Sequence, residues 1–522
     1  MTVWISRRPE AEVATELAEN RNGTGRLTGI RLAVNDNVEV AGMPTFAGWP
    51  ELAYPADADA AVVAALRAEG AIVVGKTSLD QFATGPLGSR SAGVAVSDSG
   101  RLDYISRGTS SRAAVAVSTG EADIAVATDI AVSGRVSADL PAIVGIKPTP
   151  GVISTDGVVP GCESYDCVTI FASCLRLADT AMAVLAAQAP KRSWPADTRL
   201  GAPPAPVVAI PDELPYLDGQ YRAAFDAAVA RLASSGVRVV TVAFAPFLAA
   251  AKLLSDGALV SQRWTAIGEF IDVHADATFD PAVRDIVTAA TGIPADRLIR
   301  DRAETGRLRE LAMSSLAGTD ALLVPTAPAY TDFCNPFDMC AVAVAAGNAG
   351  DTRFGVTVLA RPFDDAVALD IAALVTGEPS PETPWPLAAA DHVELVVFGA
   401  HLLGGPLVHQ LTDRGARFAG EIATAPRYRM IALPTTPPKP GVTRVPDGTD
   451  GAALTGHRWL LSPAALGQFL AELPAPMQLG KVELSDGSWR TAFGCDGSVE
   501  GADVSHYGSW PAALAAGAVT QT

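Results

Sequence analysis

Residues 107–148 read RGTSSRAAVAVSTGEADIAVATDIAVSGRVSADLPAIVGIKP, and this stretch is the most informative part of the sequence. Apolar runs in it alternate with loops rich in serine, threonine and glycine. The preceding sequence continues this alternation: residues 29–42 predict two short strands joined by a turn at 35–37, residues 58–69 an amphipathic helix, and residues 71–75 a strand. Strands that alternate with helices in this way predict an α/β sheet.

The chain divides into a long first part and a shorter second part. A polar, proline-rich stretch at 190–206 interrupts the first part, and helical patterns then dominate until a buried strand at 321–325. The segment 377–390 is rich in proline, which predicts a linker. Short strands and turns follow it, as is typical of an α+β domain. We therefore predict a first domain at 1–376 and a second at 391–522.

Charge and composition exclude several classes of protein. Lys and Arg number 39 and Asp and Glu 57 among 522 residues, which gives a formal net charge of −18. Because an acidic surface repels phosphate backbones and anionic lipids, we expect no nucleic-acid partner and no membrane partner. No apolar run is long enough to cross a bilayer, and the first residues show no apolar signal segment, so we expect a cytoplasmic protein.

The histidines and a phosphate-loop pattern limit the chemistry. All six histidines lie at or after His274, so the first half alone holds no Ser-His-Asp triad and no histidine-ligated metal. Residues 70–77, GAIVVGKT, match the letters of a phosphate-binding loop. The residues between the two glycines are apolar and mostly β-branched, which favours a buried strand over a loop with free N–H groups. We expect a strand here and no bound nucleotide.

The stretch quoted first resembles the amidase signature family, in which a Gly-Gly-Ser-Ser loop precedes a Gly-Thr-Asp-x-Gly-Gly-Ser segment. The segments GIRLAVNDNVEVAG, GKTSLDQFATG and STDGVVPGCESYDCVTIFA extend the likeness, and the last is similar to allophanate hydrolases. The segments VVFGAHLLGGPLVHQL, TAPRYRMIALPTTPPKPG and DVSHYGSWPAAL resemble the allophanate hydrolase C-terminal domain. The resemblance implies an α/β fold, with a mixed β-sheet core covered by helices, plus a smaller α+β domain of γ-glutamylcyclotransferase-like type. It also implies a homodimer that acts on a small molecule.

The chemistry of this family depends on two serines and a lysine. A serine hydroxyl is unreactive at neutral pH, and a desolvated lysine removes its proton through the second serine. The resemblance places the nucleophile at Ser133, the bridging serine at Thr109 and the lysine at Asn35. Because an asparagine amide accepts no proton, the resemblance implies a triad without its base. Lys76 and Lys147 are the two lysines of the first 190 residues. Both stay open as substitutes for the missing base, although their sequence motifs are of structural character.

Further departures from the family pattern surround the nucleophile. Val132 stands where the family has a glycine, and its branched side chain resists backbone angles that glycine allows. Arginines stand at 107 and 112, where the family has small residues. Arg263 lies in a pattern similar to a substrate-side helix, where a guanidinium binds a carboxylate; an exposed helix charge is the alternative. The expected substrate-binding residues are Arg107, Arg112, Ile130, Ala131, Val132 and Arg263, and no cofactor or metal is expected.

Three residues of the second domain are further candidates: His401, Tyr428 and Arg429. A histidine beside an arginine can bind a carboxylate and move a proton, whereas the alternative is a hydrogen-bonded histidine and a structural arginine. Cys162 and Cys167 lack a nearby histidine and are expected to be buried packing residues.

Three functions stay open from the sequence. The first is a catalyst that keeps the pocket but has lost ordinary amide hydrolysis, and performs a cyclisation, condensation or acyl transfer on a small, carboxylate-bearing molecule. The second is a pseudoenzyme that binds a ligand without turnover. The third is a working amidohydrolase with a substituted base, which fast labelling of Ser133 by a fluorophosphonate would favour.

Overall fold

A computed structural model of the chain describes residues 3–83, 97–98, 101–105, 110–130, 143–188, 191–274 and 279–519. The chain divides into two compact units, the first made of residues 1–193 and 205–389 and the second of residues 194–204 and 390–522. The short segment 194–204 therefore belongs to the second unit, although the chain returns to the first unit after it.

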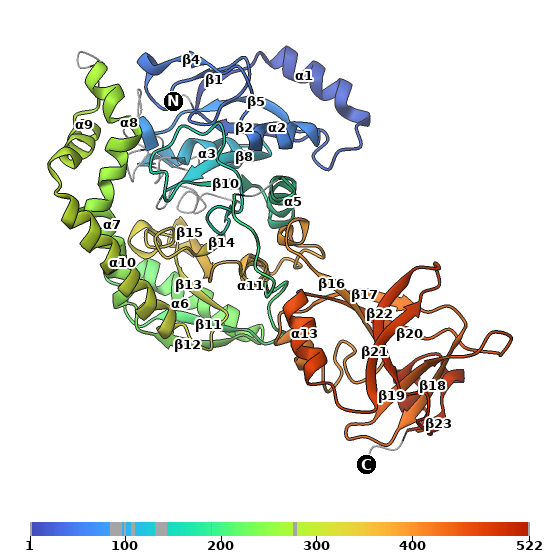
Figure 1. Cartoon of the computed structure of the whole chain (residues 1–522). Coiled ribbons are helices and arrows are strands. Elements are labelled where there is room, and N and C mark those ends of the chain that lie inside the picture. Colours follow the sequence, from blue (N-terminus) through green and yellow to red (C-terminus); the bar gives the residue numbers. More distant parts are fainter. Residues whose placement is uncertain are drawn as a thin grey trace. The chain divides into compact units, whose positions relative to one another are not determined.

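A mixed sheet of eleven strands forms the centre of the first unit (Figure 1). Its order is β1-β5-β2-β8-β10-β9-β14-β15-β13-β11-β12. The inner strands β5, β2 and β8 run parallel, whereas β10 pairs antiparallel with both β8 and β9. In sheet order the bounds are Trp4–Arg7, Ile72–Thr77, Arg31–Asn35, Ile124–Asp129, Cys167–Ala172, Val144–Lys147, Cys340–Ala349, Thr352–Ala360, Ala321–Pro325, Val207–Pro211 and Arg238–Val242.

Helices pack on this sheet: α3 and α5 contact β8 and β10, and α6 and α11 contact β14 (Figure 1). Two short ribbons, β3 with β4 and β6 with β7, complete the described strands of the first unit. The ribbon strands span Pro44–Thr45, Tyr54–Pro55, Ser97–Asp98 and Arg101–Ile105. The helices are α1 Glu10–Glu19, α2 Ala61–Ala68, α3 Ser111–Ser118, α5 Leu175–Ala186, α6 Gly219–Ser234, α7 Ala245–Asp256, α8 Ser261–Val273, α9 Pro281–Thr288, α10 Ala295–Ser315 and α11 Asp365–Thr376.

The inner strands β5 and β8 are buried along their whole length. β5 begins with Ile-Val-Val and β8 with Ile-Ala-Val-Ala, and apolar strands of this kind lie inside sheets covered on both faces. The helix α3 is made largely of alanine and valine and is buried as well, so it packs close to the sheet. These elements confirm the predicted α/β architecture.

The segment 29–42 departs from its prediction in one respect. The strand β2 and the turn after Asn35 form as expected, but the second strand does not. Val38 bridges to Val158 and Ala41 bridges to Ala56, so the two positions pair with different segments and no ladder forms.

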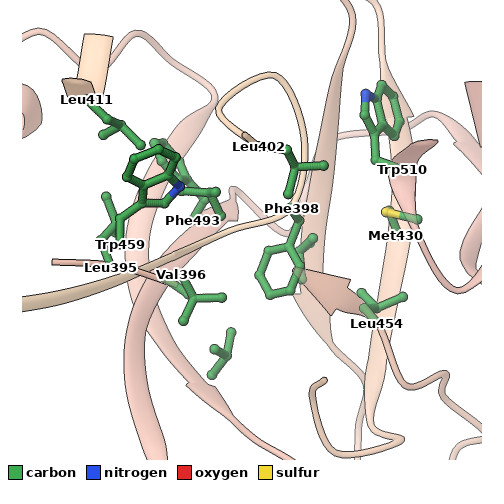
Figure 2. Packing of buried hydrophobic residues seen from close by; sticks show 14 of the residues in the cluster. Leu395, Val396, Phe398, Leu402, Leu411, Met430, Leu454, Trp459, Phe493 and Trp510 are labelled. Carbon is green, nitrogen blue, oxygen red and sulfur yellow. The ribbon is translucent and has the colours of Figure 1, made fainter. Parts of the chain in front are cut away.

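The second unit holds a five-stranded and a three-stranded sheet, in the orders β17-β20-β16-β22-β21 and β19-β18-β23. Apolar side chains fill its core, among them Phe398, Trp459, Phe493 and Trp510 (Figure 2). The strands are β16 Val393–Val397, β17 Arg417–Ala423, β18 Tyr428–Leu433, β19 Lys439–Arg444, β20 Thr455–Leu461, β21 Met477–Glu483, β22 Trp489–Cys495 and β23 Ala502–Asp503, and the helices α12 His409–Thr412, α13 Pro463–Ala471 and α14 Trp510–Ala515.

The proline-rich segment predicted as a linker is folded onto the first unit as far as Ala389. Its 3₁₀ turn η8, Trp385–Ala388, contacts α5. The buried Trp385 donates its backbone N–H to the carboxylate of Asp179 at 2.8 Å. The apolar ring and this hydrogen bond explain why prolines do not leave the segment free.

Candidate active site

Asn35 lies at the carboxyl end of β2 and is completely buried. Its Nδ2 donates to Oγ of Ser110 at 2.8 Å, and its Oδ1 accepts from the hydroxyl of Thr77 at 3.1 Å. The hydroxyl of Ser110 in turn donates to the carbonyl of Thr128 at 3.1 Å. The hydrogen bonds therefore run in one direction, from Thr77 through Asn35 and Ser110 to Thr128.

Lys76 lies on the opposite face of the sheet from Asn35. In the ladder between β2 and β5, Asn35 pairs with Thr77, and successive side chains of a strand point to opposite faces. The ammonium of Lys76 donates to Thr45 Oγ1 at 2.7 Å and to the carbonyl of Pro44 at 3.1 Å, and lies 3.7 Å from the carboxylate of Asp36. Burial lowers the pKa of Lys76 to about 8, against the opposing effect of Asp36. This ammonium serves a buried ion pair on that face.

Lys147 is also engaged elsewhere. It ends β9, is buried, and donates from Nζ to the carbonyl of Pro148 at 2.6 Å, with the sulfur of Cys167 at 4.0 Å. Neither lysine that the sequence left open as a substitute base bonds to Asn35 or Ser110 in the described part of the chain.

The end of β8 is held by a residue that the sequence analysis missed, Asn335. Its Nδ2 lies 2.8 Å from the carbonyl of Ile130, 3.0 Å from that of Asp129 and 3.0 Å from that of Tyr165. Ile130, predicted to bind substrate, has its side chain packed against Leu79 and Cys162. No local pattern in the sequence marks Asn335, because all its partners are more than one hundred residues away.

Arg112 and Ser111 begin the helix α3, directly after Ser110. Arg112 is buried; burial lowers the pKa of its guanidinium, while the charge of Asp80 raises it. The buried hydroxyl of Ser111 has no hydrogen-bond partner within the residues that the structure describes. The helix N-terminus adds a partial positive charge here, so this corner of the first unit suits an anion.

The remaining predicted residues around the nucleophile lie outside the described residues. These are Arg107, Thr109, Ala131, Val132 and Ser133.

Arg263 lies on α8, close enough to Asp166 and Cys162 for its charge to lower the pKa of both. Burial is the larger effect: it raises the pKa of Asp166 to about 6 and that of the Cys162 thiol to about 12. Gln262, the residue before Arg263 on this helix, accepts a hydrogen bond from the backbone N–H of Ser164 at its side-chain Oε1, 3.2 Å away. The helix α8 is thus tied to the turn at 161–166. The buried thiols of Cys162 and Cys167 fit the predicted packing role.

In the second unit, His401 lines a cavity of about 170 Å³. Its ring stacks on Phe493 at a centroid distance of 5.0 Å, and its Nε2 lies 2.9 Å from Oε1 of Gln410. Burial lowers the pKa of His401, the hydrogen bond to Gln410 opposes this, and the charge of Lys439, which also lines the cavity, adds to the lowering. The positive side chain beside this histidine is therefore a lysine.

Tyr428 and Arg429 do not line this cavity, which corrects the predicted grouping with His401. Both lie on β18, in the three-stranded sheet. The buried Tyr428 accepts the backbone N–H of Glu483 at its hydroxyl, 2.6 Å away, and the exposed Arg429 pairs with Asp503 at 2.8 Å. These contacts give both residues a structural role.

The pattern of the amidase family matches residues 4–342, nearly two thirds of the chain. The chain belongs to the amidase family. A second pattern, that of the allophanate hydrolase C-terminal domain, matches residues 393–515. The amidase match therefore contains Asn35, Ser110 and Asn335, and the second match contains His401.

Known relatives of this family member are similar along almost its whole length. The urea amidolyase of Lachancea kluyveri is 33% identical over 548 residues, and that of Saccharomyces cerevisiae 32% over 540 residues; the alignments cover 94% and 93% of this chain. The chain spans only 30% and 29% of the length of these two relatives. The structure of Kluyveromyces lactis allophanate hydrolase superposes with a TM-score of 0.88 at 30% identity, covering 98% of this chain and 93% of that one.

No group of three or more His, Cys, Asp or Glu side chains suited to a metal ion occurs within the described ranges. Among the described helices, none is long and apolar enough to cross a membrane.

Proposed function

We propose that this amidase family member has lost the lysine-dependent hydrolysis of amides and uses its pocket for a non-hydrolytic reaction of a small, carboxylate-bearing molecule. The reaction classes that suit such a pocket are cyclisation, condensation and acyl transfer. The observation that carries the proposal is the direction of the hydrogen bonds at Asn35. An amide nitrogen donates to Ser110 at the place that the family resemblance assigns to the catalytic base.

The direction matters because a serine nucleophile needs a group that accepts its proton. Thr77 donates to Oδ1 of Asn35, so the NH₂ group must face Ser110, and an amide NH₂ accepts no proton at accessible pH. The hydroxyl proton of Ser110 is directed to the carbonyl of Thr128. General-base catalysis typically contributes about 10²–10⁴ in rate, and this part of the site supplies none.

The proposed substrate class follows from charge. The chain carries a net charge of −18, yet Arg112 and the N-terminus of α3 place positive charge beside Ser110, where the buried Asp80 is near enough to Arg112 to raise its pKa. A carboxylate suits a guanidinium and free helix N–H groups. Allophanate, named for the relative from Kluyveromyces lactis, is a small molecule that combines a carboxylate with an amide. Malonamate replaces its central NH by CH₂ and is a stable probe of the same shape.

Roles for the residues outside the described ranges remain part of this proposal. Ser133 supplies a hydroxyl that contacts the substrate carbonyl, Thr109 links it to the network of Asn35, and Arg107, Ala131 and Val132 line the pocket. Arg263 lies beside Asp166 and binds the substrate from the α8 side.

The combined substitution of Asn35→Lys, Thr109→Ser and Val132→Gly tests the loss of hydrolysis. We expect ammonia release from allophanate to rise at least about a hundredfold over the unmodified chain, since a base and the loop glycine return. A variant that keeps Asn35 and carries the other two substitutions is the matched control and should gain little. If the triple variant folds and gains nothing, the absent lysine does not explain the inactivity.

Ser133→Ala separates a catalyst from a binding protein. A catalyst that acts through Ser133 loses its product but keeps its affinity for malonamate, measured by calorimetry. If the unmodified chain binds malonamate and forms no product from any carboxylate tested, the chain is a pseudoenzyme. Fast labelling of unmodified Ser133 by a fluorophosphonate would instead show a working amidohydrolase.

A second candidate site is the cavity beside His401, which Lys439 also lines. A lysine can hold a small carboxylate, and a neutral histidine beside it can accept a proton from the bound molecule. Lys439→Met should weaken binding of a small carboxylate to the second unit, whereas Arg429→Met, at a position outside the cavity, should not. Equal effects of the two variants would contradict this assignment.

A homodimer and a cytoplasmic location also remain predictions, the first from the resemblance and the second from composition. Sedimentation velocity of the purified chain tests the homodimer.

A further inference from the structure

The amide of Asn335 is a point where three segments of the first unit meet. Its Nδ2 lies within hydrogen-bond distance of the carbonyls of Ile130, Asp129 and Tyr165, and 3.2 Å from Oδ1 of Asp129. Asn335 is 3% exposed, so water does not supply alternative partners. One NH₂ group thus joins the end of β8 to the turn that precedes β10.

The segment that carries Asn335 is firmly anchored. The neighbouring Phe333 and Phe337 are completely buried. The ring centroid of Phe333 lies 4.9 Å from that of Phe247 and 5.8 Å from that of Phe244. An aromatic cluster of this kind fixes the backbone of the segment, and Asn335 with it.

The contact lies where the sheet stops holding β8. The ladder between β8 and β10 ends at the pair Asp129 and Cys167. Ile130 is the next residue, and its carbonyl is held by Asn335 instead of by a strand. Ser133 follows three residues later in the chain. Just before Asp129 in β8, the carbonyl of Thr128 accepts a hydrogen bond from the hydroxyl of Ser110. Ser110 in turn accepts a hydrogen bond from Asn35.

We infer that Asn335 is a positioning residue. Its amide fixes Asp129 and Ile130 at the end of β8. This sets the direction in which the chain continues toward Ser133, relative to the hydrogen-bonded pair Asn35 and Ser110. The inference rests on the proposed function for the role of Ser133. A side chain that fills space without donating cannot do this, because the carbonyls that share the two N–H donors of Asn335 would lose them.

The test compares Asn335→Asp with Thr331→Val. The aspartate keeps the shape but presents oxygens to the carbonyls, whereas Thr331→Val removes a hydroxyl that donates to the carbonyl of Ala327 in the same buried segment. Asn335→Leu, which removes the donor without adding a charge, is the second variant if the aspartate variant does not fold, and the same result is expected of it. The readouts are amide hydrogen exchange of residues 129–134 and the Kd of malonamate.

We expect exchange of residues 129–134 to be at least about tenfold faster in Asn335→Asp, with β14 and β15 unaffected and Thr331→Val within about twofold of the unmodified chain. The Kd of malonamate should rise at least about tenfold in Asn335→Asp only, because Ala131 and Val132, proposed to line the pocket, lie between Ile130 and Ser133 in the chain. Unchanged exchange in the Asn335 variant that folds overturns the inference. Faster exchange with an unchanged Kd also overturns it, since the role is then structural. If the unmodified chain binds no malonamate, the proposed function fails, and the exchange comparison alone decides the role of Asn335.

Discussion

At the scale of single residues, both polar atoms of the Asn35 side chain make hydrogen bonds, and the side chain is completely buried. Thr77→Val removes the hydroxyl that faces Oδ1 and leaves a buried acceptor without its donor. We expect the free energy of unfolding to fall by about 1–3 kcal/mol, measured by urea denaturation. The control is Thr169→Val on β10: this buried hydroxyl has no hydrogen-bond partner within the described residues, so its removal should be neutral or stabilising. Equal losses in the two variants would contradict the account of Asn35.

Asp166 gives a prediction about pH. Burial raises its pKa from the ordinary 3.8 to about 6 in the folded chain, so the folded state holds the proton more tightly than the unfolded state. Its favourable contribution is complete below pH 3.8 and is lost as the pH rises through 6. Asp166→Asn removes this loss, so from acid to neutral pH the variant should gain up to about 3 kcal/mol relative to the unmodified chain.

The control for Asp166 is Ser164→Ala, which changes an exposed, uncharged side chain in the same turn. Its stability should follow the pH dependence of the unmodified chain from about pH 4 to 7, as measured by denaturation at each pH. A constant difference between Asp166→Asn and the unmodified chain over this range would contradict the raised pKa.

At the scale of elements, β5 shows why the glycine of GAIVVGKT is not part of a phosphate loop. Gly75 lies within the strand, where an added Cβ would lie 2.7 Å from the carbonyl oxygen of Ser6 on β1. We expect Gly75→Ala to separate β1 from β5 and to lower the free energy of unfolding by about 1–3 kcal/mol. Millimolar MgATP should not change the melting temperature of the unmodified chain. A rise in that temperature with MgATP would restore the phosphate-loop interpretation.

Strands marked by continuous apolar runs were predictable from sequence alone. The strand β13 spans the predicted residues 321–325, and β5 contains most of the predicted 71–75, because a buried run of this kind suits only the inside of a sheet. The prediction of a second strand within residues 29–42 was wrong, because the pairing of this segment depends on Val158 and Ala56, which lie outside it in the chain.

Only those features of the site that depend on the type of a single residue were predictable from the sequence. The replacement of a base by Asn35 is visible in the sequence, whereas the direction of its hydrogen bonds depends on Thr77 and Ser110. Asn335 and Lys439 were missed, and Arg429 was wrongly grouped with His401, because tertiary contacts alone decide which side chains meet.

At the scale of the whole molecule, the segment 194–204 completes the second unit. Leu200 is buried and donates its N–H to the carbonyl of Gly415 at 2.8 Å, and Ala464 donates to the carbonyl of Ala196 at 3.0 Å. We expect a fragment of residues 390–522 to be less stable than the complete unit by about 2–4 kcal/mol, since a buried leucine and two hydrogen bonds are lost. A synthetic peptide of residues 194–204 should raise its melting temperature, and a Leu200→Ala peptide should do so less. No effect of either peptide would contradict the assignment of this segment.

The most direct test of the lost base is ammonia release from allophanate by the purified, unmodified chain, measured beside Kluyveromyces lactis allophanate hydrolase. With an amide at position 35 donating to Ser110, we predict a kcat/KM at least about a thousandfold below that of the relative. A kcat/KM within about tenfold of the relative, abolished by Ser133→Ala, would show that another group takes the proton and would contradict the account.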